Sequence, residues 1–359
     1  MSYRQLQRVL KNLGLRRKNK EENLDDIIIC ILSELESSGS CLGYKSLWHR
    51  LKTLHGLDVK RQTVLDILRI VDQEGIVHRS KYRLKRRTYN VPGPNFIWHI
   101  DGYDKLKPFD FAIHGCIDGF SRKVMWLELA TSNNKPEIIC YYYLKAAQKF
   151  KQIPAIIRSD HGTENSTVEI VHQALRSGHS DPYAGLHSFI KGKSTANQRV
   201  ESSWGRMRRH SVEFWINFFK DMVECRDFDR SNKIQVECLR FCFAPLIKFD
   251  LEQTRKGWNR HNIRKQKCDN VKSGKPNFMY YVPNAVQCAN WGQEVKKEHI
   301  ENAIREFTET PTYCNSDFVK LVNDIFPGLS TPANVEEATI LYHQILNEIN
   351  QYNDNDDIL

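Results

Sequence analysis

The stretch that decides the fold is residues 96–130, FIWHIDGYDKLKPFDFAIHGCIDGFSRKVMWLELA. Three short runs in it, at 96–103, 111–117 and 123–130, are rich in β-branched and aromatic residues. Turn-prone segments such as DGFSR separate them. Such closely spaced runs are typical of strands joined by short connections. We therefore predict three consecutive antiparallel strands.

Beyond residue 130 the pattern alternates between helices and strands. A helix is expected over 135–150, because Pro136 suits a first helical turn. Three antiparallel strands followed by such alternation indicate an α/β domain, a mixed sheet covered by helices. The further elements that we predict are a strand in IPAIIRSD (153–160), a helix over 167–177, a short strand in LHSFI (186–190) and a long helix from about residue 195.

Three acidic residues of this region are candidate metal ligands, namely Asp101, Asp160 and Glu201. The two aspartates end predicted strands, at the sheet edge where α/β proteins tend to hold their sites, and Glu201 lies in the long helix. Mg²⁺ takes oxygen ligands and keeps waters that substrate phosphates can replace. Two such ions, roughly 3.5–4 Å apart, serve in-line phosphoryl displacements. Each acid taken alone is better explained as an ordinary surface residue or helix cap, because Asp and Glu are common.

The segments around these acids resemble the integrase catalytic core of retroviruses, retroelements and bacterial insertion-sequence transposases. The resemblance covers about residues 95–265 and is closest to the integrase-core-domain proteins of animal and fungal genomes. Those proteins carry a signature similar to Gly192–Trp204 here. The matching segments are WHIDGY (98–103), CIDGFSRKV (116–124), RSDHGTEN (158–165) and STANQRVESSWGRMRR (194–209).

This resemblance implies an RNase H-like fold and a catalytic, metal-binding Asp-Asp-Glu triad of Asp101, Asp160 and Glu201. It also implies Mg²⁺ or Mn²⁺ as cofactor, as two ions, and a homo-oligomer that acts on DNA ends. Between the aspartates lie 58 residues, in keeping with the family, and 40 residues separate Asp160 from Glu201. The slightly long second interval is explained by an insertion in the loop 177–188. Glu164 is rejected as third acid because it is too near Asp160 in sequence.

Basic residues surround the predicted glutamate. Asn197 shares its helical face and is a supporting residue. A basic rim would position DNA backbone rather than read bases, although residues 206–209 could equally face solvent. The residues that we predict to bind nucleic acid here are Lys191, Lys193, Arg199, Arg206, Arg208 and Arg209, whereas Trp204, Phe214, Trp215, Phe218 and Phe219 are interpreted as core packing.

The first 90 residues predict helices at 2–13, 23–35, 44–54 and 61–73. The last two, joined by a turn with a glycine, form a helix–turn–helix pattern and resemble the region that precedes many integrase cores. In a DNA-binding interpretation Lys60, Arg61 and Gln62 enter the major groove, whereas a plain helical hairpin would explain the spacing as well. The helix at 2–13 has no predicted neighbour, so we expect it to end a module that is incomplete in this sequence.

The basic run at 78–95 ends in Pro-Gly-Pro, and we place a domain boundary there. We predict that Lys85, Arg86 and Arg87 contact DNA backbone; a nuclear address or a solvated linker are the alternatives. The predicted domains are 1–90, helical and DNA-binding; 95–265, the catalytic core; and 266–359, an extension ending in a helical tail. Phe318, Leu321, Ile325, Ile340, Leu341, Ile345 and Ile349 have helical spacing in that extension.

Charge is unevenly distributed along the 359 residues. Residues 1–95 carry a net charge of +9, residues 96–300 carry +10 and residues 301–359 carry −9. The basic part favours a polyanion partner. Ten cysteines without a CxxC pair argue against a zinc module, and Cys238 and Cys242 fit one helical face. No apolar signal core or membrane-length apolar run is present, so we expect a nuclear or cytosolic protein without membrane contact.

Two functions remain open from the sequence. The first is an integrase or transposase that cleaves DNA phosphodiesters with metal and transfers a 3′ hydroxyl to target DNA. The second is a domesticated or decayed element-derived protein that binds DNA without catalysis. A nuclease of the same fold that acts on RNA–DNA hybrids is a third, for which the helix–turn–helix pattern would be an unusual companion.

Overall fold

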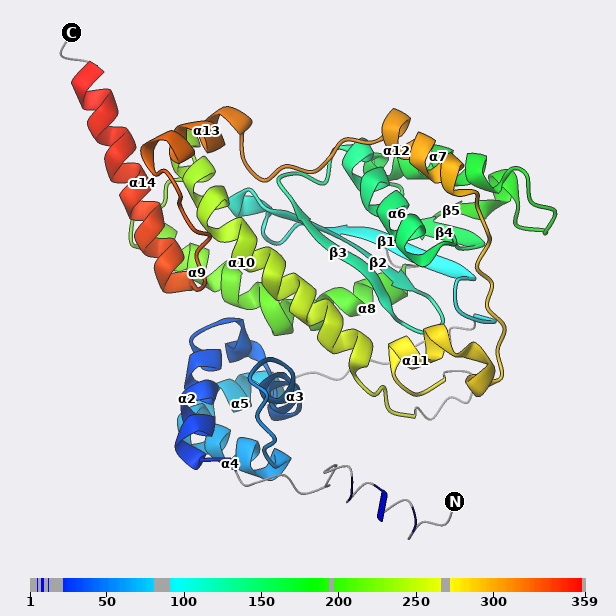
Figure 1. The fold of residues 1–359 in the computed structure, drawn as a ribbon, viewed down its shortest axis with the longest axis horizontal. Coiled ribbons are helices and arrows are strands. Elements are labelled where there is room, and N and C mark those ends of the chain that lie inside the picture. The colour runs from blue at the N-terminus through cyan, green and yellow to red at the C-terminus, as the bar shows by residue number, and fades with distance from the viewer. Residues whose placement is uncertain are drawn as a thin grey trace. The chain divides into compact units, whose positions relative to one another are not determined.

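The computed structural model describes residues 5, 8, 9, 12, 22–80, 91–193, 197–265 and 272–356 (Figure 1). The chain forms two compact units, Met1–Arg83 and Leu84–Leu359. Most of the helix predicted over 2–13 lies outside the described residues. So do Lys85, Arg86 and Arg87.

The first unit is a small bundle of helices around an apolar core that includes Ile31, Leu47 and Val64. Its first helix begins as expected, because the side chain of Asn23 caps it by accepting a hydrogen bond from the backbone N–H of Asp25. The three helices predicted here are confirmed, but the third ends at Val71 instead of residue 73 and another helix follows. The bounds are α2 Leu24–Leu35, α3 Tyr44–Leu54, α4 Arg61–Val71 and α5 Gln73–Ser80.

The second unit is built on a five-stranded mixed sheet with the order β3-β2-β1-β4-β5. β1 and β2 pair antiparallel, as do β2 and β3, whereas β4 runs parallel to both β1 and β5. This arrangement confirms the predicted RNase H-like α/β fold. The strands are β1 Ile97–Tyr103, β2 Ala112–Asp118, β3 Val124–Ala130, β4 Ile156–Ser159 and β5 Phe189–Lys191.

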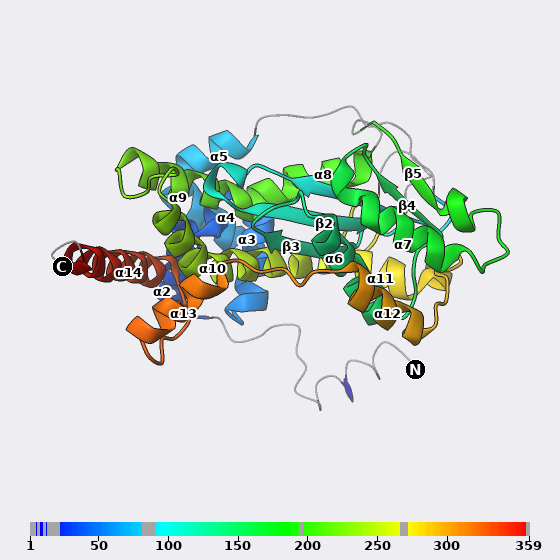
Figure 2. The same ribbon diagram turned by 90° about the horizontal axis from the view of Figure 1, so that it is seen from above.

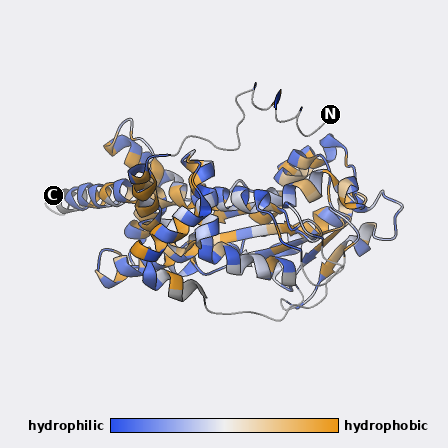
Figure 3. Ribbon diagram, turned by 90° about the horizontal axis from the view of Figure 1, so that it is seen from below, coloured by the Kyte–Doolittle hydropathy of each residue, from blue (hydrophilic) through white to orange (hydrophobic). Residues whose placement is uncertain are grey.

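Alternating residues of the central strands face two different helical layers. In β1, Trp98 and Ile100 pack toward the α6 layer, and Tyr103 packs toward the α8 layer. Figure 2 shows the sheet between α8 on one side and α6 and α12 on the other. Figure 3 shows hydrophobic and hydrophilic residues together on the covering helices, as amphipathic helices require. The α6 layer contains α6 Pro136–Phe150, α7 Ser166–Arg176 and α12 Lys297–Phe307.

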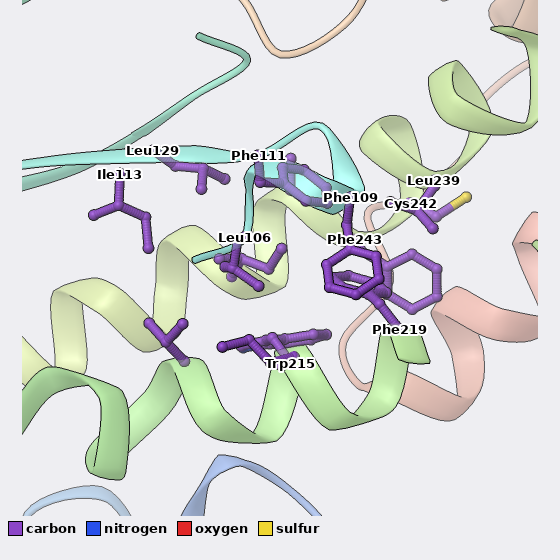
Figure 4. Close-up of a cluster of buried hydrophobic side chains, with 14 of the residues drawn as sticks. Leu106, Phe109, Phe111, Ile113, Leu129, Trp215, Phe219, Leu239, Cys242 and Phe243 are labelled. Atoms are coloured by element: carbon purple, nitrogen blue, oxygen red, sulfur yellow. The ribbon is translucent and has the colours of Figure 1, made fainter. Parts of the chain in front are cut away.

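The larger core lies on the α8 side, where aromatic rings of several helices meet the sheet (Figure 4). Trp215 and Phe219 pack there with Phe243 at ring separations of 5.6 to 6.3 Å. Cys238 and Cys242 share the buried face of one long helix, as predicted. The remaining helices are α8 Gln198–Met207, α9 Glu213–Glu224, α10 Lys233–Arg260, α11 Pro276–Tyr281, α13 Ser316–Ile325 and α14 Val335–Asp356.

The C-terminal helices complete this core. Leu341, Tyr342 and Ile345 of α14 are buried in the same cluster as α10, so the tail residues predicted to be helical are helical and lie with α9 and α10 on that side of the sheet. None of the helices within the described ranges is long and apolar enough to span a membrane.

The long helix predicted from residue 195 is not continuous. It begins at Gln198 and is interrupted at Arg208–Val212 by a π-helical segment, after which α9 continues. A π-turn accommodates one more residue than an α-turn, so the apolar spacing of the sequence does not reveal it. Such segments occur frequently at functional sites.

Candidate functional site

β1 and β4 bring the two predicted aspartates together. Ile97 pairs with Ile156 and His99 with Arg158 in the parallel ladder, and the same register continued by two residues places Asp101 level with Asp160. Both side chains then lie on the α8 face, since side chains of a strand alternate. Asp160 directly follows β4, as predicted, but β1 extends to Tyr103, so Asp101 lies within its strand and not at the end.

The first turn of α8 carries the predicted glutamate to this edge. Asn197 precedes the helix, and its backbone carbonyl accepts a hydrogen bond from the N–H of Glu201 at 3.2 Å. The buried Asn197 side chain donates to the carbonyl of Ile100 at 3.0 Å and lies 2.6 Å from Nδ1 of His99. These contacts fasten the start of α8 to β1.

The three carboxylates influence one another electrostatically. The pKa of Asp101 is raised to about 7, chiefly by burial and further by the negative charges of Glu201 and Asp160. A hydrogen bond from Trp204 opposes that rise. Partial burial and the charge of Asp160 also raise the pKa of Glu201. A cluster of like charges is the environment that a divalent cation would relieve.

Trp204 contacts Asp101 directly. Its indole Nε1 donates to Oδ2 of Asp101 at 2.7 Å. The ring lies over Gly115, which pairs with Asp101 in the β1–β2 ladder. A Cβ at residue 115 would come within 2.5 Å of the Trp204 ring, so only glycine leaves this ring its place. Trp204 is buried, as its interpretation as core packing predicted, and Trp215 and Phe219 are buried as well. Phe214 and Phe218 are partly buried against that core.

His99 is a neutral group beneath the carboxylate edge. Its pKa is lowered to about 3, chiefly by burial and also by the charges of Arg158 and Arg199. A neutral histidine carries one N–H, so Nδ1 donates to the Asn197 amide oxygen. The guanidinium of Arg158 reaches beneath Gly192, and its Nε has no hydrogen-bond partner among the residues that the structure describes. Positive charge therefore lies on β4 beside the acidic edge.

The predicted basic rim comes from β5 and the residues after it and from α8 and the segment that follows it, and several members already have partners within the chain. Lys191 pairs with Glu169. Arg206 stacks over Trp258 at 4.0 Å, and Arg208 pairs with Glu213. Lys193 and Arg209 are exposed, while Arg199 is partly buried in the first turn of α8.

The predicted groove-binding residues belong to the first unit, where they begin α4. Lys60, Arg61 and Gln62 are all exposed. The Arg61 guanidinium stacks over Trp48 at 4.1 Å, and Gln62 donates to Asp66 at 2.8 Å. Their assignment to DNA stays a prediction.

The donor set suits a hard cation, although the described residues contain no group of three or more His, Cys, Asp or Glu side chains already spaced to hold a metal ion. Carboxylate oxygens are the ligands that Mg²⁺ prefers, and it completes its shell with water and substrate phosphate. Glu164, rejected above as the third acid, lies in a short turn after Asp160. Its pKa is raised by burial and by the charges of Asp160 and Asp104.

Four features of the site were not predicted from the sequence: His99, Arg158, Gly115 and the hydrogen bond of Trp204. A signal for His99 was available, because strand alternation in WHIDGY puts it on the face of Asp101. Trp204 is also three residues after Glu201, so the two share a helical face. Nothing in the local sequence links Trp204 to Gly115, since that contact joins different elements.

Residues 88–289 match the protein family that is described as Integrase core domain. No curated protein matches this sequence. Among solved structures, the chain is similar to one in the simian T-cell lymphotropic virus intasome in complex with PP2A regulatory subunit B56 gamma. The identity is 16%, the TM-score is 0.36, and the match covers 75% of this chain and 78% of that chain. The matched family segment spans more than half of the chain and includes all three acids. The chain belongs to the integrase core domain family.

Proposed function

We propose that this protein cleaves and joins DNA phosphodiesters, with Asp101, Asp160 and Glu201 holding two Mg²⁺ or Mn²⁺ ions. The observation that carries this proposal is the meeting of the three acids at one sheet edge, where burial and the charges of Glu201 and Asp160 raise the pKa of Asp101. Bound there, the ions would supply Lewis-acid stabilisation to the phosphoryl group.

The chain's own residues supply position and charge. Asn197 and His99 tie α8 to β1, so Glu201 is presented to the two aspartates from a fixed helix. Arg158, Lys193 and Arg199 would contact DNA phosphates beside the acids. Lys60, Arg61 and Gln62 of the first unit would contact a DNA groove, in a protein that works as a homo-oligomer on DNA ends in the nucleus.

The test uses the full chain with labelled short duplexes, a supercoiled plasmid as target, and Mg²⁺ or Mn²⁺. We expect nicked and joined products from the wild type and none from Asp160→Asn or Glu201→Gln. Glu164→Gln, which alters the rejected acid, should keep the activity. Equal cutting by Asp160→Asn would contradict the site assignment. A wild type that shifts DNA in gels without cutting it would support a DNA-binding protein without catalysis.

A further inference from the structure

We propose that Trp204 is a positioning residue for Asp101: its indole N–H holds the carboxylate in one orientation toward the divalent cation, and Gly115 provides the space for the ring. This inference rests on the proposed function. It assigns to Trp204 a task beyond filling the core.

The hydrogen bond restricts the carboxylate. An indole has a single polar group, a donor, and here it meets Oδ2 of Asp101 at 2.7 Å. With one oxygen held, the carboxylate cannot rotate about its Cβ–Cγ bond without breaking the bond. Trp204 is 6% exposed, so water competes poorly for the N–H.

The indole is itself fixed on three sides. The Tyr103 ring lies 5.2 Å away between ring centres, tilted by 39°. On the sheet side the ring occupies the space over Gly115, where any Cβ would lie 2.5 Å from its Cη2 atom. On the helix side it is anchored to α8, which also carries Glu201. The hydrogen bond therefore fixes the orientation of the Asp101 carboxylate relative to α8, the helix that carries Glu201.

A second tryptophan provides a matched control. Trp215 of α9 donates from Nε1 to Oδ2 of Asp250 at 3.0 Å, and its ring is buried in the same large core. That bond joins α9 to α10 and involves none of the three acids. Removing it tests the loss of a buried Trp–Asp bond without touching Asp101.

The experiment measures binding of Mn²⁺ alone by electron paramagnetic resonance for the wild type, Trp204→Phe and Trp215→Phe. Replacing Trp204 by β-(3-benzothienyl)alanine gives a further variant, which keeps the bicyclic shape without the N–H and covers the case that phenylalanine impairs folding. Loss of a group that orients a metal ligand typically weakens metal binding about 10- to 100-fold. We expect such a weakening in both residue-204 variants and none in Trp215→Phe.

A second readout follows the N–H itself. In protein labelled with ¹⁵N at its seven tryptophans, the indole signal absent from Trp204→Phe belongs to Trp204. That signal should shift on addition of Mg²⁺ and in Asp101→Asn, while the Trp215 signal stays in place. Wild-type Mn²⁺ affinity in a folded residue-204 variant would overturn the inference and leave the proposed function intact. Absence of Mn²⁺ binding by the wild type would overturn both.

Discussion

Gly115 faces Asp101 across the antiparallel β1–β2 ladder, and the space over this glycine holds the indole ring that donates to the Asp101 carboxylate. A strand position without a side chain thus lets a helix residue reach the acid on the neighbouring strand. The packing of the Trp204 ring over Gly115 and the hydrogen bond to Asp101 therefore depend on each other. A substitution that displaces the ring should also weaken this bond.

Gly115→Ala tests that coupling. The added Cβ would lie 2.5 Å from the Trp204 ring, so the ring must shift and its bond to Asp101 weakens. Overpacking and a lost buried hydrogen bond together should cost about 2–3 kcal/mol of unfolding free energy, measured by urea denaturation. Gly205→Ala in α8, where an added Cβ meets nothing within 4 Å, is the control. It should be neutral or stabilising by up to about 1 kcal/mol. Equal effects of the two alanines would contradict the close contact.

The protonation of Asp101 predicts a pH dependence of stability. Its folded-state pKa of about 7 lies above the usual 3.8, so the folded protein favours the protonated form. The resulting stabilisation is complete below about pH 4 and is lost as the pH rises through 7. We therefore expect Asp101→Asn to be more stable than the wild type at pH 8, by up to about 4 kcal/mol, and similar to it at pH 4.

Urea denaturation at several pH values from 4 to 8 measures that difference. Asp221→Asn, which alters an exposed acid of α9, should follow the wild type throughout. Adding Mg²⁺ at pH 8 should stabilise the wild type and not Asp101→Asn, because a cation bound to the acids favours the folded state. A constant difference between Asp101→Asn and the wild type across the pH range would show that burial does not shift this group.

Asn197→Ala should loosen the start of α8. The substitution removes the hydrogen bonds to the Ile100 carbonyl and to His99, and it leaves both of these buried groups without that partner. We expect a loss of about 2–4 kcal/mol in urea denaturation. The variant should also lose DNA cleavage, because Glu201 lies one turn further along the same helix. Ser202→Ala, on the exposed side of α8, is the control and should keep both stability and activity.

The first unit predicts a salt-dependent contribution to DNA binding. If Lys60 contacts a phosphate, Lys60→Ala reduces the slope of log K against log [salt] by about 1. Arg69→Ala provides the comparison, since Arg69 lies near the other end of α4 and pairs with Asp66. It should leave the slope unchanged. Fluorescence anisotropy of a labelled duplex between 50 and 200 mM salt measures both. An unchanged slope in Lys60→Ala would argue for a helical hairpin that does not contact DNA.

Local patterns determined much of this protein. Runs of β-branched and aromatic residues predicted β1, β2 and β3 to within one residue, and the Asn23 cap predicted the start of α2. Helical spacing also placed Asn197 beside Glu201, and the backbone N–H of Glu201 donates to the carbonyl of Asn197. These are short-range properties, because the 2.0 and 3.6 residue periods are set by neighbouring backbone geometry.

Other features were hidden from the sequence. Pro245 predicts a helix break, yet it lies inside the 28-residue helix α10. The stabilisation from burying one face of α10 against β3 outweighs the loss of one backbone hydrogen bond. The π-helical segment after α8 has no signature in the apolar spacing either. In α10 tertiary packing decides the local structure, since burial of several large side chains exceeds the preference of one residue.

The sequence by itself determined the α/β pattern and the candidate acids Asp101, Asp160 and Glu201. Only the tertiary structure decided which residues hold them in place. Trp204 forms a hydrogen bond with Asp101 over a sequence separation of 103 residues, and Asn197 forms one with His99 over a separation of 98 residues. Periodicity tells which face a side chain occupies but not which distant element will cover that face. The partner is set when the α8 helix docks on the sheet, where the space over Gly115 admits the Trp204 ring and its buried N–H needs an acceptor, which Asp101 supplies.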